Sequence, residues 1–419
     1  MRIAVLGAGL AGITSAWECL RDGHDVIVLD RADTPADFTS KANAGLIAPG
    51  HAFAWASPRV PGIMLRSLWT RNQAIRYRPS FDVRQWRWLS QFLRQCTTNR
   101  ARINTLRKAR LCLYSQSRLQ LVTDETAFPY DRNTGGLIYF YRSAQSFEAA
   151  AIKSEILASQ GVRIESLDRD QVIARDPGLA DARDIISGAL YVPSDESGDA
   201  RLFTDRLAQR CVERGARLQM QTEITGIQTE SGRVTAVTTN QGPVFADAFI
   251  LALGVFSPNL LHQFGVRIPI YPVKGYSVTL PSGEDHCLPK LGGVDEDNLL
   301  AYCPMGNRLR ITATAEIGNY NTAYTPDDFR IMLSKAQALM PRAADFSTPN
   351  YWAGLRPMTP TGLPLIGRSR WSNLWLNTGH GHMGWTMSCG SARILADLII
   401  NNQPEIPLEG IDPATMGMA

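Results

Sequence analysis

A glycine-rich turn near the N-terminus carries the clearest candidate chemistry in this sequence. It follows an apolar run at 2–6, precedes a helix-like stretch that extends to Gly23, and reads Gly7-Ala8-Gly9-Leu10-Ala11-Gly12. Gly7 allows a tight turn, Gly9 lets the backbone approach a pyrophosphate, and Gly12 lets the helix pack closely on the strand. The helix N-terminus also offers free N–H groups and a positive dipole end to phosphate oxygens. An ordinary strand-to-helix turn is the alternative interpretation.

A second apolar run, 26–29, ends at Asp30 and Arg31. A carboxylate at the tip of this strand can accept hydrogen bonds from ribose hydroxyls. The order strand, glycine turn, helix, strand and acid therefore predicts a dinucleotide-binding βαβ unit. The cofactor contacts expected from this unit are Gly7, Gly9, Leu10, Ala11, Gly12, Asp30 and Arg31.

Two further segments are expected to face the same ligand. In the loop at 40–51, Ser40 and Asn43 can donate hydrogen bonds to phosphate, and small residues around Gly45 suit close backbone approach. The stretch 244–254 reads as a buried parallel strand that ends at Gly254. A plain surface loop and a buried strand with a turn glycine are the alternatives. The contacts added here are Ser40, Asn43, Ala44, Gly45, Leu46 and Gly254.

The C-terminal part repeats the arrangement of strand, glycine turn and helix. A strand at 374–377 leads into Thr378-Gly379-His380-Gly381-His382-Met383-Gly384, and an amphipathic helix follows at 385–400. A nicotinamide has no obvious use for a second helix N-terminus. A flavin does, because its two-electron reduction places negative charge on the ring, which a helix N-terminus stabilises by roughly 0.3–2 kcal/mol. The contacts expected here are Gly379, His380, Gly381, Gly384, Trp385 and Thr386.

Length and composition bound the remaining possibilities. The chain has 419 residues and a net charge of +4, which suits two domains and does not by itself favour nucleic acid. Its seven cysteines are scattered, with no CxxC pair and no cysteine–histidine cluster, so we expect neither a metal site nor a disulfide framework. The chain enters its first strand at once, and its most apolar stretch, 248–256, is too short to span a bilayer. We therefore expect a cytoplasmic protein.

The middle of the chain predicts a second, mixed sheet with helices. Residues 59–120, 146–160 and 203–214 read as helical. Short alternating apolar patterns predict strands at 136–141, 185–192, 271–280, 299–303 and 309–313.

Six separated segments of this chain resemble the D-amino-acid oxidase and glycine oxidase superfamily of flavoproteins, and within it the bacterial D-amino acid dehydrogenase (small subunit) family. They are GAGLAG (7–12), SKANAGLIAPG (40–50), LYVPSDESGDARLFT (190–204), YPVKGYS (271–277), WAGLRPMTPTGLPLIGR (352–368) and LWLNTGHGHMGWTMSCGS (374–391). The resemblance implies non-covalent FAD and oxidation of a D-amino acid to an imino acid, which water converts to a 2-oxo acid and ammonia. It also implies electron transfer to a quinone or another carrier.

The resemblance also implies a fold. We expect an α/β (α+β) protein whose Rossmann-like βαβ domain binds FAD and carries an inserted mixed-sheet substrate domain. The expected FAD-binding domain comprises 1–58, 193–265 and 353–402. The expected substrate domain comprises 59–192 and 266–352, and 403–419 forms a C-terminal tail.

Arg356 is the first candidate for the substrate site. A guanidinium grips a carboxylate with two parallel hydrogen bonds, and the arginine of the matching motif holds the substrate carboxylate in the superfamily. Tyr276 is a second candidate, as a hydroxyl donor to the same carboxylate. His51, His380 and His382 are candidates for shaping the pocket or accepting the amine proton. A structural role is the alternative for each, and the amine proton can also pass to water.

His51 and His382 depart from the family pattern, where the positions usually carry an aromatic and a small polar residue, so substrate preference stays open. A D-hydroxyproline or D-proline dehydrogenase and an oxygen-using oxidase are the alternative enzymes. A flavin-containing subunit that docks a partner is the non-enzyme alternative.

The segment 59–110 combines positive charge with aromatic residues. It has one acid, Asp82, against thirteen basic residues: Arg59, Arg66, Arg71, Arg76, Arg78, Arg84, Arg87, Arg94, Arg100, Arg102, Arg107, Lys108 and Arg110. Trp69, Tyr77, Phe81, Trp86, Trp88 and Phe92 lie between them. Such a surface can meet anionic lipid headgroups on the cytoplasmic face of the inner membrane, as reduction of a membrane quinone would require. A solvated helical face with core tryptophans is the alternative. Nothing else in the chain supports nucleic-acid binding.

Overall fold

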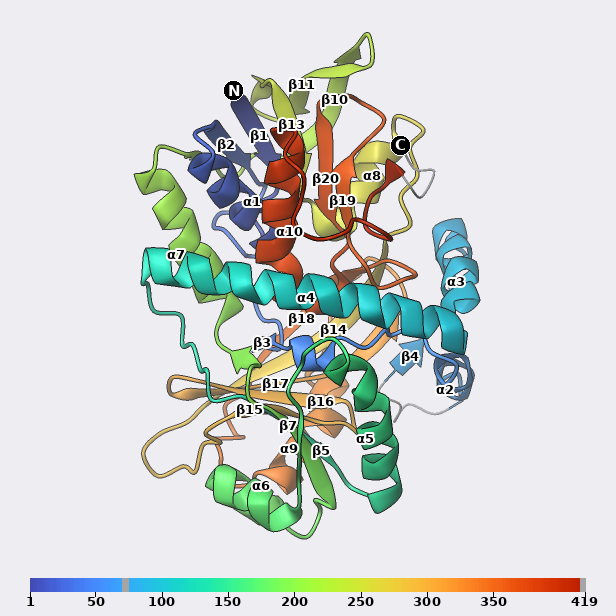
Figure 1. Ribbon diagram of the computed structural model, residues 1–419, viewed down its shortest axis with the longest axis vertical. Helices are drawn as coiled ribbons and strands as arrows, with labels where there is room; N and C mark the ends of the chain where they lie inside the picture. The colour runs from blue at the N-terminus through green and yellow to red at the C-terminus, as the bar shows by residue number, and fades with distance from the viewer. Residues whose placement is uncertain (70–74, 415–419) are drawn as a thin grey trace.

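A six-stranded sheet and a nine-stranded sheet form the two halves of the molecule. The computed structural model describes residues 1–69 and 75–414. In Figure 1 the six-stranded sheet lies in the upper half and the nine-stranded sheet in the lower half, with the long helix α4 (Thr98–Thr126) crossing between them. This arrangement confirms the expected α/β fold with two sheet-based halves.

The six-stranded sheet is the expected nucleotide-binding sheet. All neighbouring strands are parallel except the pair β19 and β20. Its strands in spatial order are β19 (Leu365–Arg368), β20 (Leu374–Thr378), β13 (Ala248–Leu251), β1 (Arg2–Leu6), β2 (Asp25–Leu29) and β9 (Arg217–Gln219). Strands β1, β2 and β13 are almost continuously apolar and buried, because a parallel sheet is covered on both faces.

Each face of this sheet has its own cover. Helices α1 (Leu10–Arg21), α7 (Ala200–Glu213) and α10 (Gly384–Ile399) pack on the face that carries Ile3 and Val5. The small antiparallel sheet and α8 (Ser257–His262) pack on the face that carries Ala4 and Leu6. That small sheet consists of β10 (Ile224–Glu230), β11 (Arg233–Thr239) and β12 (Gly242–Phe245). The segment expected as one strand at 244–254 is therefore divided between β12 and β13, in two different sheets.

The nine-stranded sheet is mixed, as the alternating patterns predicted. Its strands in spatial order are β18 (Asn350–Met358), β14 (Tyr271–Pro281), β17 (Arg308–Ile317), β16 (Leu300–Met305), β15 (Gly292–Asp295), β5 (Leu137–Tyr141), β7 (Gly188–Val192) and β6 (Glu165–Leu167), with β4 (Ile75–Tyr77) paired to β17. One face packs on a core that includes α9 (Arg330–Leu339) and α6 (Arg169–Arg175). Strands β3 (Leu46–Ile47) and β8 (Glu196–Ser197) pair in a separate antiparallel two-stranded sheet.

Helices α2 (Val60–Arg66), α3 (Val83–Gln95), α4 and α5 (Ala144–Ala158) complete the fold. Helix α4 packs against α10 of the first half, where the Gly390 N–H donates to Ser115 Oγ at 3.0 Å. A Cβ on Gly390 would lie 2.7 Å from Ser115 atoms, so the glycine permits the close crossing. Helix α4 thus belongs to both halves, although it was expected in the substrate domain alone. Strand β4 likewise interrupts the segment expected to be helical at 59–120.

The strand pairing moves two expected domain boundaries. Strand β18 pairs with β14, so the return to the first half comes after Met358 and not at 353. Val266, Ile268 and Ile270 pack in the core of the six-stranded sheet, so the middle segment extends to about Ile270 and not 265. The described part of the expected tail, 403–414, packs on the first half through the buried Ile411. Residues 415–419 lie outside the described part of the chain.

Candidate active site

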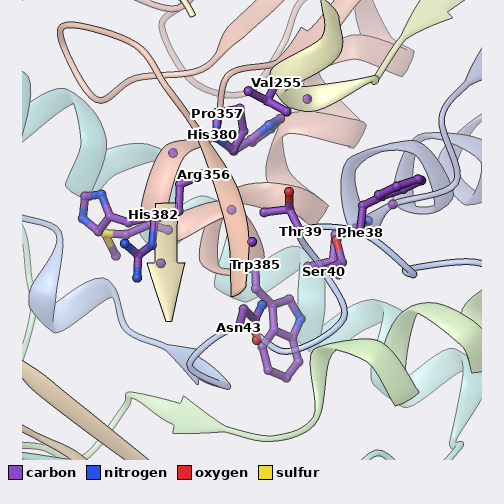
Figure 2. Close-up of a pocket in the computed structure, with 18 of the residues that line it drawn as sticks. Phe38, Thr39, Ser40, Asn43, Val255, Arg356, Pro357, His380, His382 and Trp385 are labelled. Carbon is purple, nitrogen blue, oxygen red and sulfur yellow. Dashed lines mark hydrogen bonds between the residues drawn. The ribbon is translucent and has the colours of Figure 1, made fainter. Parts of the chain in front are cut away.

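A cavity of about 450 Å³ lies at the carboxyl ends of the parallel strands, where open α/β sheets bind ligands. It collects most of the contacts expected from the sequence. These are Gly7, Gly9, Leu10, Ala11, Asp30, Arg31, Ser40, Asn43, Ala44, Gly45, Leu46, Gly254, His380, Gly381, Gly384, Trp385 and Thr386. Gly12 and Gly379 do not line it. Figure 2 shows Arg356 and His382 at one end of the pocket. Phe38 and Ser40 lie at the opposite end of the same view.

Two glycines of the turn, Gly7 and Gly12, leave no room for a side chain. A Cβ on Gly12 would lie 1.8 Å from the Gly7 carbonyl oxygen, and one on Gly7 would lie 2.7 Å from the Ala252 oxygen. Gly12 therefore acts through packing and not through ligand contact. Gly9 is the N-cap of α1 and supplies no side-chain cap. The N-terminus of α1 thus faces the cavity, and the one hydrogen bond that its first N–H groups make to a described side chain runs from Leu10 N–H to Ser40 Oγ at 3.2 Å.

Asp30 holds the glycine turn in shape. Its carboxylate accepts hydrogen bonds from the Ala8 N–H at 2.6 Å and the Ala32 N–H at 2.9 Å. Each carboxylate oxygen keeps a further lone pair, so the expected ribose contact is compatible with this bracing. Asn43 is also partly engaged, because its Oδ1 accepts from the Gly45 N–H at 3.0 Å. The donor that Asn43 keeps for a ligand is its amide nitrogen.

A second helix N-terminus borders the cavity. The short 3-10 helix Gly381–Met383 runs directly into α10, and neither start has a side-chain cap. Trp385 lines the cavity, and its indole N–H is buried without a hydrogen-bond partner among the described residues. A buried donor of this kind fits a ligand with carbonyl or hydroxyl acceptors. An elongated dinucleotide fits these features of the cavity. They are two helix starts without side-chain caps, the tight glycine turn and the unpaired indole N–H of Trp385.

Arg356 is the unpaired charge of the site. It extends from β18 and lines the cavity, and within the described residues its side chain makes one hydrogen bond, from Nη1 to the Thr314 carbonyl oxygen at 3.4 Å. No acid within the described ranges forms an ion pair with it, so the alternative of a structural salt bridge is not observed. Burial lowers the pKa of Arg356 to about 10. A buried guanidinium without an anion is costly, so the geometry favours a ligand carboxylate.

Two glycines make room for this arginine and its neighbour. A Cβ on Gly275 would lie 2.5 Å from Arg356 Nη2. A Cβ on Gly354 would lie 2.0 Å from the Trp352 ring, which also lines the cavity. Neither glycine was identified from the sequence. The signal was present, because both lie in the quoted segments and share the alternating face of Arg356.

The hydroxyl of Tyr276 does not lie where the sequence predicted a donor to the substrate carboxylate. It borders the cavity through its strand, but its ring is 2% exposed and packs edge-on against Phe329 in the core on the other face of the sheet. Its hydroxyl donates to Glu316 at 3.4 Å. Successive strand residues point to opposite faces, so the neighbour Gly275, and not Tyr276, shares the side of Arg356. The structure thus does not bring this hydroxyl to the substrate end.

The His380 ring is hydrogen-bonded to α10 and does not offer Nε2 to a substrate. Its Nε2 lies 2.9 Å from Ser391 Oγ on α10, and burial lowers the pKa of His380 to about 4. A neutral ring tied to α10 serves to position the helix start. The expectation that His380 acts as a catalytic base is therefore not supported by this geometry.

His382 and His51 do face the cavity. Burial, together with the nearby charges of Lys108 and Arg356, holds the pKa of His382 well below its usual range. His382 is thus a neutral ring beside the arginine. His51 Nε2 lies 2.7 Å from Glu296 Oε1, and its ring stacks on Tyr139 with centroids 5.1 Å apart.

Apolar side chains fill the rest of the substrate end. Trp55, Ile75, Val273 and Ala315 line the same cavity and belong to, or pack on, one core cluster. The sequence reasoning missed these four. Trp55 and Ile75 come from loops and a short strand whose position depends on tertiary contacts alone.

Comparison with known proteins points to one family. A family model described as "FAD dependent oxidoreductase" (DAO) matches residues 2–398. "D-amino acid dehydrogenase 2" of Mesorhizobium japonicum is 42% identical over 98% of this chain and 99% of that protein. "D-amino acid dehydrogenase" of Granulibacter bethesdensis is 42% identical over 97% of each chain. Among solved structures, glycine oxidase from Geobacillus kaustophilus is similar in fold, with a TM-score of 0.77, 22% identity and 98% coverage of each chain.

Proposed function

Because this chain belongs to the DAO family of FAD-dependent oxidoreductases, we propose that it oxidises a D-amino acid to an imino acid, which water converts to a 2-oxo acid and ammonia. The names of relatives at 42% identity over nearly the whole chain support this assignment. The observation that carries it is the buried guanidinium of Arg356, which has no acid partner and faces the cavity.

The residues divide into two groups along the cavity. The glycine turn, the start of α1 and Ser40 would hold the dinucleotide phosphates, and Trp385 would donate to an acceptor on the bound group. FAD, when bound, accepts the hydride that leaves the substrate Cα. Arg356 fixes the substrate carboxylate with two parallel hydrogen bonds, so that the Cα–H is presented in one orientation.

The remaining lining limits the substrate side chain. Trp55, Ile75 and Val273 favour an apolar group such as that of D-alanine. A D-proline or D-hydroxyproline substrate is the second candidate. It is favoured by His382, whose neutral ring faces the cavity and can hydrogen-bond a substrate hydroxyl.

The test is anaerobic reduction of the purified yellow protein. We expect rapid loss of the flavin's visible absorbance with one or more of D-alanine, D-proline and cis-4-hydroxy-D-proline, and none with the L-forms or glycine. Re-oxidation in air, compared with a quinone analogue, then distinguishes an oxidase from a dehydrogenase. Absence of reduction by every amine tested would contradict the proposal and favour a subunit that only docks a partner.

We also propose that electrons leave to a quinone at a membrane surface, through an apolar and basic face formed by α3 and the segments that precede it. Trp69 is 75% exposed, and Phe81 and Trp86 are also exposed beside Arg84, Arg87 and Arg94. The same segment contributes to the core, since Trp88, Phe92 and Lys108 are buried. Arg71 lies outside the described residues. No helix in the described part of the chain is long and apolar enough to cross a bilayer.

The membrane proposal predicts salt-dependent binding. The protein should pellet with anionic vesicles at low salt and be released as salt screens the charge, since each cation near the surface contributes about 1 kcal/mol. Replacing Arg84, Arg87 and Arg94 by Glu should weaken pelleting and quinone reduction but leave flavin reduction by the substrate intact. The matched control replaces the exposed Arg163, Arg183 and Arg330 by Glu, which carries the same change of charge elsewhere. Wild-type protein that ignores anionic vesicles at low salt would contradict the proposal.

A further inference from the structure

Glu296 does not line the cavity, but its carboxylate contacts His51, which does. Among the described residues, His51 is the cavity histidine that has an acid partner. Glu296 follows β15 and places Oε1 2.7 Å from Nε2 of His51. Burial alone would raise the pKa of Glu296, but His51 and Lys153 lower it below its usual value. Glu296 is thus a carboxylate held against the ring, with Oε1 in ion-pair contact with Nε2.

The plane of the His51 ring is fixed as well. Tyr139 stacks on it with an interplanar angle of 9°, and Phe53 meets it edge-on. The Tyr139 hydroxyl donates to Asp195 at 2.6 Å, and the Gly50 N–H, next to His51 in the chain, donates to the same carboxylate at 2.9 Å. Burial raises the pKa of Asp195 to about 7. The stacking partner of His51 and the backbone next to it are therefore both hydrogen-bonded to Asp195. These contacts hold the His51 ring in a single orientation.

Nε2 of His51 lies against Glu296, which leaves the other ring nitrogen for the substrate end. Nδ1 of His51 has no hydrogen bond among the described residues, and His51 lines the substrate end of the cavity with Arg356 and His382. The charged or titratable groups that face the pair are Glu296, Asp195, Tyr139, Tyr141, Lys153 and His382. The pKa of His382 is held well below its usual range, which makes that ring a poor proton acceptor, so Nδ1 of His51 is the acceptor that this end of the cavity offers.

We propose that His51 takes the proton of the substrate ammonium on Nδ1, and that Glu296 is the positioning residue that keeps the ring in the tautomer able to do so. This rests on the proposed function. An N–H bond of the ammonium breaks, the Nδ1–H bond of His51 forms, and the substrate nitrogen keeps the electron pair as the lone pair that the oxidation requires. The Glu296 carboxylate balances the charge of the imidazolium until the proton passes to solvent.

The kinetic test compares Glu296→Gln with wild-type holoenzyme across pH. At neutral pH we expect the rate of flavin reduction to fall about 10- to 100-fold, within the range that a positioned proton acceptor contributes. In buffer alkaline enough to deprotonate the free substrate amine, the variant and wild type should converge, because no acceptor is then needed. A loss that persists undiminished at alkaline pH, or no loss at any pH, would overturn the proposal.

Two controls separate position from charge. Asp297→Asn removes the same charge from the next residue, whose side chain accepts from Arg142 N–H and Ser146 and does not touch His51. It should behave as wild type. His51→Asn should reproduce the loss, and the double variant with Glu296→Gln should be no slower than His51→Asn alone, since both changes remove one function. Additive losses would contradict the pairing.

A spectroscopic arm does not depend on turnover. In ¹⁵N-histidine spectra recorded in alkaline buffer, the His51 ring of the wild type should be the Nε2–H tautomer, and Glu296→Gln should give a mixture. His51→Asn assigns the signal among the six histidines. An Nδ1–H tautomer in the wild type would overturn the proposal. If no amino acid reduces the flavin, the proposed function fails, whereas this arm still decides whether Glu296 sets the tautomer.

Discussion

Arg356→Ala should abolish most substrate binding while leaving the folded, yellow protein intact. Losing one partner of a buried charge pair costs about 2–5 kcal/mol, so KM or the substrate Kd should rise by about 30- to 5,000-fold. The melting temperature should not fall, because the guanidinium has no acid partner in the protein and its removal relieves a buried unpaired charge. Flavin absorbance, melting temperature and substrate titration measure the three quantities on one sample.

Two variants refine this result. Gly275→Ala keeps the arginine but places a Cβ 2.5 Å from Nη2, so it should also weaken substrate binding by displacing the guanidinium. Gly318→Ala is the matched control in the same half, because its Cβ would meet nothing closer than 3.7 Å. A near-normal KM in Arg356→Ala with FAD retained would show that another group holds the carboxylate.

Gly12→Ala should yield protein that has lost FAD and part of its stability. Its Cβ would lie 1.8 Å from the Gly7 oxygen and 2.8 Å from the Gly7 carbon, and both are backbone atoms that cannot rotate away. The helix must then separate from the glycine turn, which destroys the phosphate site and overpacks the core at a cost of about 1–3 kcal/mol or more. The flavin-to-protein absorbance ratio and the melting temperature report the two losses separately.

Gly226→Ala is the control for this change. Its Cβ would approach nothing closer than Gln263 Oε1 at 3.8 Å, so the same chemical substitution should leave FAD content and stability near those of the wild type. Stoichiometric FAD and an unchanged melting temperature in Gly12→Ala would show that the turn tolerates a larger spacing than the structure indicates.

The local chemistry of the dinucleotide site could be predicted from the sequence. The turn at 7–12, the strand before it and the acid after β2 are adjacent in the chain, and the steric need for glycine at such a turn is a local property of the backbone. Arg356 could be predicted as a cavity residue for a similar reason, because its motif surrounds it with turn residues. The roles of Gly7, Gly9 and Gly12 follow from the same short-range geometry.

The face on which a side chain lies was decided only by the tertiary structure. Tyr276 and Gly275 are neighbours, yet pairing of β14 with β17 and β18 directs the tyrosine into the core and leaves the glycine beside Arg356. His380 and His382 are separated by one residue and both line the cavity, but the His380 ring is bound to Ser391, whereas the His382 ring has no hydrogen bond to a described residue. A shift of one residue in the strand register moves every side chain to the opposite face of the sheet. Residue type alone does not determine that register.

Contacts between distant segments were beyond the sequence for the same physical reason. Glu296 reaches His51 across 245 positions of the chain, and β18 joins the nine-stranded sheet because β14 lies beside it. Trp86 is exposed and Trp88 is buried on one helix because of what packs against it. The sequence by itself predicted the turns, the glycines and the charged group that we expect to bind a dinucleotide and a carboxylate. The tertiary structure decided which neighbours each side chain meets, because burial and pairing depend on segments that the local pattern does not contain.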